Sequence, residues 1–145
     1  MKKFLPLLLV VFVWPFWGAT QTAAVEQWAQ SYNGATSGNE STTCSYKDNS
    51  GYTYVTGYNE SGTFVLKFDN TGVVTFSTQY VDANNAYISP KIIQTDAAGN
   101  IYLAGTKFYG GEYYVSAVKF NMAGTVQWEA EHNTHEGAIF IDAMI

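Results

Sequence analysis

Short apolar runs alternate with turn residues along most of the chain, and they predict β-strands. In the second half of the sequence, β-branched and aromatic residues are dense over Ile88–Thr95, Asn100–Thr106, Tyr113–Asn121 and Thr125–His132. Each run has the length of a strand and is bounded by turn residues such as Asp, Asn and Gly. No helical period lies between the runs, so the pattern indicates an all-β chain.

The same strand pattern occurs twice, over residues 38–80 and 86–132. The first parts of the two copies align with an offset of 48 residues (Gly51 to Gly99), and the second parts with an offset of 52 (Lys67 to Lys119). Four extra residues therefore lie between these parts in the second copy. The positions that define the repeat are Asp48, Gly51, Tyr54, Gly57, Lys67 and Gly72, and then Asp96, Gly99, Asn100, Tyr102, Gly105, Lys119, Gly124 and Trp128.

The connections between the strands have turn chemistry. Asp48, Asp69, Asp96 and Asn121 each precede a Gly by three residues. An Asp or Asn side chain accepts backbone N–H groups at such a corner, while Gly adopts the positive φ that closes a hairpin. We therefore predict a tight turn at each of these positions.

The four inserted residues of the second copy lie around residues 107–111. We expect them to lengthen a hairpin loop, where an insertion costs little. This loop is the candidate ligand-binding surface, because its aromatic residues do not follow the repeat. They are Phe108, Tyr109, Tyr113 and Tyr114.

Four-stranded units of about 50 residues are typical of β-propeller blades. A stacked solenoid needs shorter repeats, and a sandwich gives no reason for the same residue types to recur at matching positions. The predicted fold class is therefore all-β, with two four-stranded antiparallel propeller blades, at residues 38–80 and 86–132. Rings typically need about 4 to 8 blades, so we expect an incomplete β-propeller.

The sequence beside the two copies resembles parts of further copies. Residues 25–32 resemble the last strand of a copy, with Trp28 in the place of Trp128. Residues 138–145 resemble the start of a third copy. We interpret residues 25–145 as a partial propeller with an orphan strand at each end. Unpaired strand edges favour self-association, which we expect of the isolated chain.

The repeat resembles a known family. Its motif, Asp-x-x-Gly-Asn-x-Tyr-x-x-Gly followed by Lys-Phe-Asn-x-x-Gly and Gln-Trp, is similar to the SBBP-type repeat of seven-bladed β-propellers in bacterial secreted and cell-surface proteins. The likeness covers residues 41–132, and the first copy departs from it with Tyr52 in place of Asn and Phe76 in place of Trp. The resemblance implies a binding or scaffold module and no particular activity.

Residues 1–24 have the order of a secretory signal peptide. Lys2 and Lys3 precede an apolar run over residues 4–17, and small residues follow up to position 24. The run contains two prolines and is shorter than the ~20 residues that a membrane helix needs. We therefore predict cleavage and export, to a secreted or cell-surface location, with no membrane span after cleavage.

The charge of the chain limits the classes of partner that it can bind, and its cysteine content limits its covalent links. Without Lys2 and Lys3, the chain has five lysines, no arginine and twelve acidic residues, a net charge of −7. Nucleic-acid binding needs clustered Lys or Arg, so this class of partner is excluded. Cys44 is the only cysteine, which excludes an intrachain disulfide. Its alignment with Ile92 predicts a buried, unreactive thiol.

Few residues suggest chemistry. The segment 131–136 contains His132 and His135, but their i,i+3 spacing at a strand end and the lack of a third ligand favour a solvated loop. We interpret Lys67 and Lys119 as stems packed along the sheets, with the ammonium near a loop carboxylate or carbonyl. We predict no catalytic residue, no metal and no cofactor.

Three functions remain open. The first is a non-catalytic binding or scaffold module whose ligand is an unknown protein or polysaccharide. The second is part of a propeller enzyme whose central-channel site other blades complete, and the third is a structural spacer. The expected inner strands of the two copies share no repeated titratable group, which favours a chain that is not an enzyme.

Overall fold

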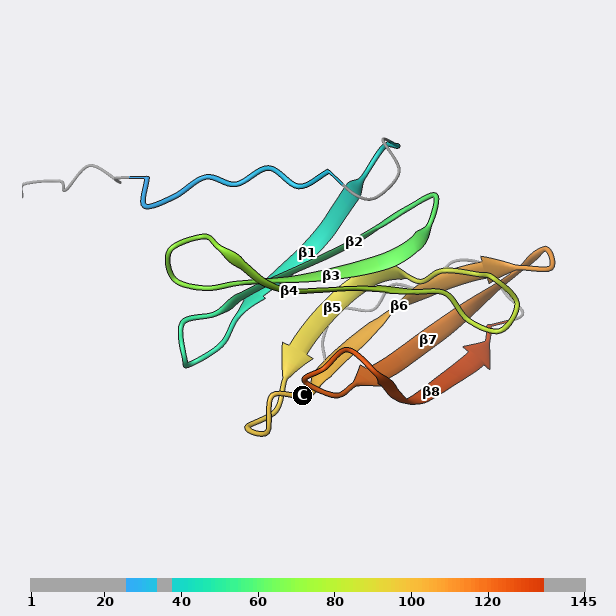
Figure 1. Ribbon diagram of the computed structural model, residues 1–145. Helices are drawn as coiled ribbons and strands as arrows, with labels where there is room; N and C mark the ends of the chain where they lie inside the picture. The colour runs from blue at the N-terminus through green and yellow to red at the C-terminus, as the bar shows by residue number, and fades with distance from the viewer. Residues whose placement is uncertain (1–25, 34–37, 135–145) are drawn as a thin grey trace, which may run out of the picture.

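The computed structural model describes residues 26–33 and 38–134, which form two four-stranded antiparallel sheets (Figure 1). Sheet 1 consists of β1 (Ser41–Lys47), β2 (Thr53–Asn59), β3 (Gly62–Phe68) and β4 (Val74–Tyr80). Sheet 2 consists of β5 (Ser89–Thr95), β6 (Ile101–Tyr109), β7 (Glu112–Phe120) and β8 (Val126–Asn133). In both sheets the strand order follows the chain, and the described residues include no helix. The predicted all-β class with two four-stranded antiparallel sheets is confirmed.

The turns have the predicted chemistry. At Asp48, Asp69, Asp96 and Asn121, the side-chain Oδ1 accepts the N–H groups of the second and fourth residues that follow. The Gly three residues after each of them has a φ between 79° and 90°. A fifth turn of this design, which the sequence analysis missed, begins at Asp82. Asn85 takes the place of Gly there, with a φ of 60°.

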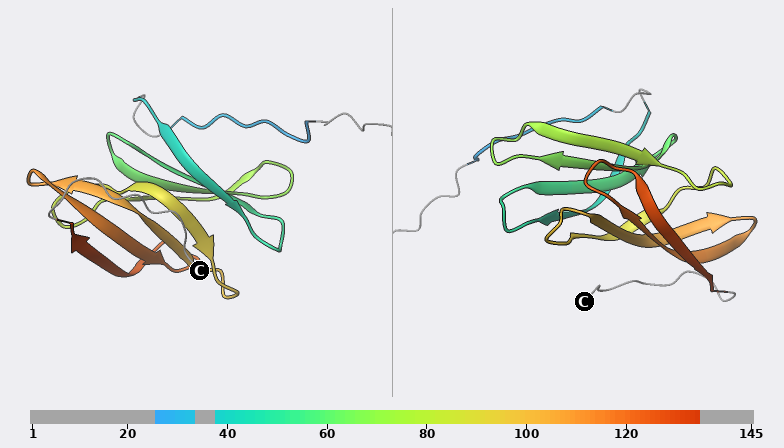
Figure 2. Two further views of the ribbon diagram at one scale, coloured as in Figure 1. Left: turned by 180° about the vertical axis from the view of Figure 1, so that it is seen from behind. Right: turned by 60° about the horizontal axis from the view of Figure 1, so that its bottom comes forward.

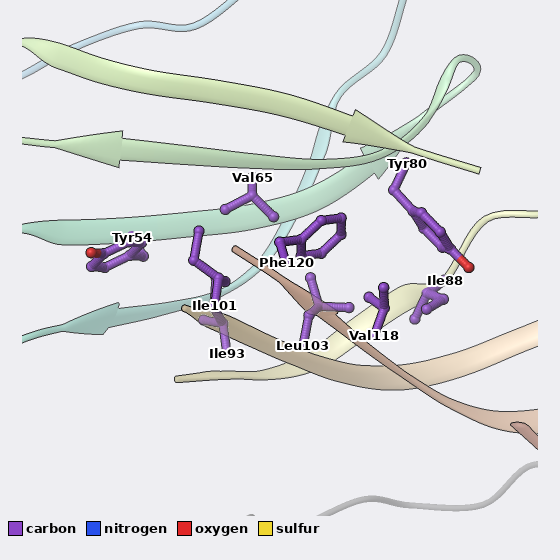
Figure 3. Packing of buried hydrophobic residues seen from close by; sticks show 9 residues of the cluster. All are labelled: Tyr54, Val65, Tyr80, Ile88, Ile93, Ile101, Leu103, Val118 and Phe120. Atoms are coloured by element: carbon purple, nitrogen blue, oxygen red, sulfur yellow. The ribbon is translucent and has the colours of Figure 1, made fainter. Parts of the chain in front are cut away.

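The main core lies between the two sheets, which face each other in the views of Figures 1 and 2. Side chains from β2, β3 and the end of β4 meet side chains from β5, β6 and β7 and from Ile88, just before β5 (Figure 3). Alternate strand residues point to opposite faces, so the period-2 pattern of each strand selects these side chains. They are Tyr54, Val65, Tyr80, Ile88, Ile93, Ile101, Leu103, Val118 and Phe120.

A buried hydroxyl also joins the sheets. Thr63 Oγ1, at the start of β3, donates to the carbonyl of Ile88 at 2.6 Å and accepts the Ile88 N–H at 2.8 Å. Because a hydroxyl has both a donor and acceptor lone pairs, one side chain satisfies two backbone groups of the other sheet. The strands of the two sheets approach most closely at β1 and β5.

Residues 26–33 pack on the face of sheet 1 that points away from sheet 2 (Figure 1). The ring of Trp28 stacks on Phe68 with centroids 5.5 Å apart, and Tyr32 contacts Phe64 at 5.5 Å. The predicted strand at residues 25–32 is wrong in one respect, because no strand is assigned within residues 26–33. No described strand pairs with this segment, and its contacts with sheet 1 are made by the side chains of Trp28 and Tyr32.

The position of Trp28 nevertheless matches the repeat. A Cβ built on Gly72 would lie 2.7 Å from the Trp28 ring, and a Cβ built on Gly124 would lie 2.7 Å from the Phe76 ring. Gly72 and Gly124 are equivalent positions of the two copies. Trp28 therefore packs on sheet 1 as Phe76 of β4 packs on sheet 2. The predicted signal peptide at residues 1–24 and the predicted start of a third copy at 138–145 lie outside the described residues.

Candidate functional site

The inserted residues of the second copy lengthen two strands. Each of β6 and β7 has nine residues, whereas β2 and β3 have seven. The expectation of a longer loop is therefore wrong, because β-pairing continues as far as Tyr109 opposite Glu112. Only Gly110 and Gly111 remain in the turn, with φ values of 62° and 86°. Two consecutive positive φ values give the tight turn that suits the twist of a hairpin.

The four predicted ligand-loop aromatics lie on this hairpin, but on two different faces. Phe108 and Tyr113 are paired across the hairpin, and their ring centroids are 4.8 Å apart. They are 60% and 41% exposed, so their apolar rings lie largely in solvent. Tyr109 is also exposed, one position further along β6 and therefore on the opposite face.

Tyr114 belongs to that opposite face and is less exposed than the other three. The ammonium of Lys107, its partner across the hairpin, lies 5.5 Å from the centre of its ring. The Tyr114 hydroxyl donates to Glu112 Oε2 at 3.4 Å. The structure thus brings Phe108 and Tyr113 together as one exposed pair and gives Tyr114 polar partners of its own.

A charged cluster lies where this hairpin meets the end of sheet 1. Lys107 Nζ donates to Asp82 Oδ2 at 2.6 Å and also to Glu131 Oε2. The side chains of Lys107 and Asp82 are only 4% and 5% exposed, whereas that of Glu131 is about half exposed. Sequence reasoning missed this cluster, because Lys107 takes the place of Asn59 of the first copy and its partners come from outside the repeat motif.

The ionisation of the cluster follows from these contacts. Burial alone would lower the pKa of Lys107, but its hydrogen bonds to Asp82 and Glu131 outweigh burial and raise the pKa. Burial would raise the pKa of Asp82, but the hydrogen bonds from Lys107 and from the N–H groups of Ala86 and Asn84, together with the Lys107 charge, outweigh burial and lower the pKa. Both groups are therefore charged at neutral pH.

A cavity of about 160 Å³ adjoins the cluster, between the end of sheet 1 and strands β7 and β8. Its polar walls include Tyr80, whose hydroxyl donates to Glu129 Oε2. Burial, followed by the nearby Glu129 carboxylate, raises the pKa of Tyr80. Ser116 also lines the cavity; it is 4% exposed, and among the described residues its Oγ has no hydrogen-bond partner.

The structure also shows the surroundings of Lys119, Lys67 and Cys44. Lys119 Nζ lies 4.0 Å from Asp96 Oδ2 and 4.8 Å from the centre of the Tyr102 ring, as the stem interpretation predicts. Lys67 instead lies over the Tyr52 ring, 3.9 Å from its centre. Cys44 is only partly buried, so the prediction of a core thiol holds in part; burial raises its pKa and disfavours the reactive thiolate.

The segment 131–136, which contains metal-ligating residue types, is described by the structure only as far as residue 134. Residues 131–133 belong to β8, where Glu131 binds Lys107, and His135 lies outside the described residues. Within residues 26–33 and 38–134, no group of three or more His, Cys, Asp or Glu side chains is placed to hold a metal ion.

Comparison with known proteins adds no assignment. No model of a protein family matches the sequence, and no curated protein matches it. Among the residues that the structure describes, none belongs to a helix with the length and apolarity of a membrane span.

Proposed function

We propose that this chain is a non-catalytic, polysaccharide-binding module of an exported protein and that it binds through the β6–β7 hairpin. The observation that carries the proposal is the exposed ring pair Phe108 and Tyr113 on a hairpin that is longer than its counterpart. Aromatic rings present apolar faces at a small entropic cost, and sugar rings stack on such faces through their C–H groups. A rigid two-stranded support holds the pair more firmly than a loop would.

We also propose that the two sheets are blades of an incomplete β-propeller of the SBBP type. Three features support this proposal: the repeat, the face-to-face packing with its closest approach at β1 and β5, and the equivalent packing of Trp28 and Phe76. The same face of each copy receives an aromatic residue from the preceding element. Stacking of this kind continues naturally into a ring of further sheets.

A binding module is favoured over an enzyme by the state of the charged groups. Lys107 is paired with both Asp82 and Glu131, and the turn carboxylates accept backbone N–H groups. These side chains already make ion pairs and hydrogen bonds within the fold, whereas a general acid or base needs a free position toward a substrate.

A glycan array tests the binding proposal. The full chain is applied beside two variants, Phe108→Ala/Tyr113→Ala and Trp128→Ala. The second is a control for an exposed ring elsewhere, since Trp128 is 44% exposed and pairs with Lys119 of β7, six positions along the strand from Tyr113. We expect at least one glycan to bind, and the double variant to lose about tenfold or more in affinity while the control keeps it. Absence of any glycan ligand, or equal binding by the double variant, would overturn the proposal.

Light scattering tests the propeller proposal separately. Among the described residues, the outer edges of both sheets have no strand neighbour, which favours association of the chain with itself. We expect masses above that of the 16.0 kDa monomer. A monodisperse monomer at all concentrations would contradict this expectation without affecting the glycan result.

A further inference from the structure

The cavity beside Lys107 has features of a ligand site that the hairpin does not explain. It lies between Tyr80 and Asp82 of one sheet end and Ser116, Glu129 and Glu131 of β7 and β8. We propose that this cavity binds a primary alkylammonium group, the chemistry found at the end of a lysine side chain or in an alkyl amine. The inference does not rest on the proposed polysaccharide binding.

The charge of the cavity selects a cation. Three carboxylates line it, from Asp82, Glu129 and Glu131, whereas Lys107 is the one cationic side chain among its lining residues. One positive charge against three negative ones leaves a net charge of −2. Anions are excluded, and a ligand with a single positive charge lowers the repulsion between the carboxylates.

The hydrogen-bonding groups that line the cavity favour a ligand that donates hydrogen bonds. Lys107 donates to Asp82 and Glu131, and the Tyr80 hydroxyl donates to Glu129, so the Lys107 ammonium and the Tyr80 phenol already have partners. A carboxylate has about four acceptor positions, so Glu129 keeps acceptor capacity beyond the bond from Tyr80. An ammonium has three N–H donors and no acceptor, which complements a wall of acceptors.

Ser116 is the observation that points to an occupant rather than to a closed ion-pair network. Its side chain lines the cavity, is 96% buried and leaves Oγ without a partner. A buried hydroxyl without a hydrogen bond is costly, by about 1–3 kcal/mol, and native proteins rarely leave one unpaired. Ser116 is paired with Glu131 across β7 and β8, so an ammonium near Ser116 Oγ also lies beside a carboxylate.

The volume limits the size of the ligand. A cavity of about 150 Å³ can hold benzene, which has six non-hydrogen atoms. The 160 Å³ found here therefore fits an ammonium with a stem of four or five carbons. Larger amines would need to leave part of the molecule outside, on the side where Glu129 and Glu131 are exposed to solvent.

NMR titration of the full chain tests the proposal, with n-butylammonium as the probe at pH 7. Three matched compounds separate its features: n-butanol lacks the charge, butyrate reverses it, and tetramethylammonium has the charge without N–H donors. We expect n-butylammonium to shift the amide signals of residues around Ser116 and Glu129 in a saturable way. Its affinity should exceed that of each matched compound by about tenfold, the ratio that one lost charged hydrogen bond produces.

Two variants test the assigned residues. Ser116→Ala and Glu129→Gln should each weaken n-butylammonium about tenfold, and neither removes a partner of the buried Lys107. Lys119→Met, whose site lies on the other face of sheet 2, should bind like the unchanged chain. Circular dichroism confirms that each variant is folded.

Three results would overturn the proposal. They are the absence of a saturable shift, equal affinity for n-butanol, and unchanged binding by both cavity variants. The first would mean that the cavity takes no amine, the second that charge does not select its ligand, and the third that the amine binds elsewhere on the chain. The glycan result is independent of all three, because its residues lie on the hairpin.

Discussion

The two sheets are copies of one repeat, yet equivalent residues have different surroundings. Tyr54 is 2% exposed in the core between the sheets, whereas Tyr102, its counterpart, lies on the opposite face of sheet 2 and is only partly buried. Phe76 packs on Gly124, whereas its counterpart Trp128 is 44% exposed. The repeat therefore determines where a side chain points, and the neighbouring element determines whether it is buried.

The second difference lies at the ends of the hairpins. Asn59 ends β2, and its counterpart Lys107 lies within the extended β6. Both side chains are buried, but only Lys107 has ionic partners from β8 and from the turn at Asp82. Lys107 in place of Asn59, and Glu131 in place of Gln79, thus create a charged site that the other copy lacks.

The largest contrast is expected between equivalent tyrosines. Tyr54→Ala should lower the free energy of unfolding by about 3–5 kcal/mol, because it removes a large ring from a closed core. Tyr102→Ala should cost clearly less, since its ring is partly in solvent. Both hydroxyls donate to the Asp of the preceding turn, so that contribution is matched. Urea unfolding measures both; equal losses would contradict the assignment of one covered and one open face.

Removal of the buried ammonium is expected to have the next largest effect. Lys107→Met should destabilise the chain by about 3 kcal/mol, because Asp82 would stay buried without its cation. The double variant Lys107→Met/Asp82→Asn should recover part of this loss. Lys119→Met serves as the control, because its ammonium is more exposed and lies 4.0 Å from Asp96. The same loss in single and double variants would argue against the ion pair.

A smaller effect is expected at the turn glycines. Gly99→Ala tests φ strain alone, because φ is +79° and the nearest other atom would be 3.7 Å from the new Cβ. We expect a loss of about 1 kcal/mol. Gly124→Ala has the same φ but meets the Phe76 ring at 2.7 Å, so its loss should be about 2 kcal/mol. Equal decreases in the melting temperature of the two variants would mean that the Phe76 ring moves aside without an energetic cost.

The smallest effect concerns one carboxylate. The Asn100 side chain, followed by backbone N–H groups and Tyr102, lowers the pKa of Asp96 to about 2. The folded state thus favours the charged form, and the resulting stability is present above the ordinary pKa of about 4 and is lost as pH falls toward 2. Asn100→Ala should raise the NMR titration midpoint of Asp96. A midpoint unchanged by this variant would assign the shift to the backbone donors.

Much of the fold could be predicted from local sequence. The strands, the turns at Asp48, Asp69, Asp96 and Asn121, and the pairing of strands within each copy depend on residues close together in the chain. The insertion was located correctly, but its conformation was not, because alternation in a short aromatic run did not distinguish strand from loop. The four aromatic residues stay a prediction as a binding site, and the structure places them on a paired hairpin instead of a loop.

The sequence alone determined the all-β class, the two copies and the chemistry of their turns, since strand alternation and Asx-Gly corners are encoded within a few residues. Only the tertiary structure decided which equivalent positions are buried and that Lys107 meets Asp82 and Glu131. Those residues are 24 and 25 positions away from Lys107; Glu131 reaches it across β7 within sheet 2, and Asp82 reaches it from the end of sheet 1. Contacts at such separation follow from packing, which no local pattern encodes.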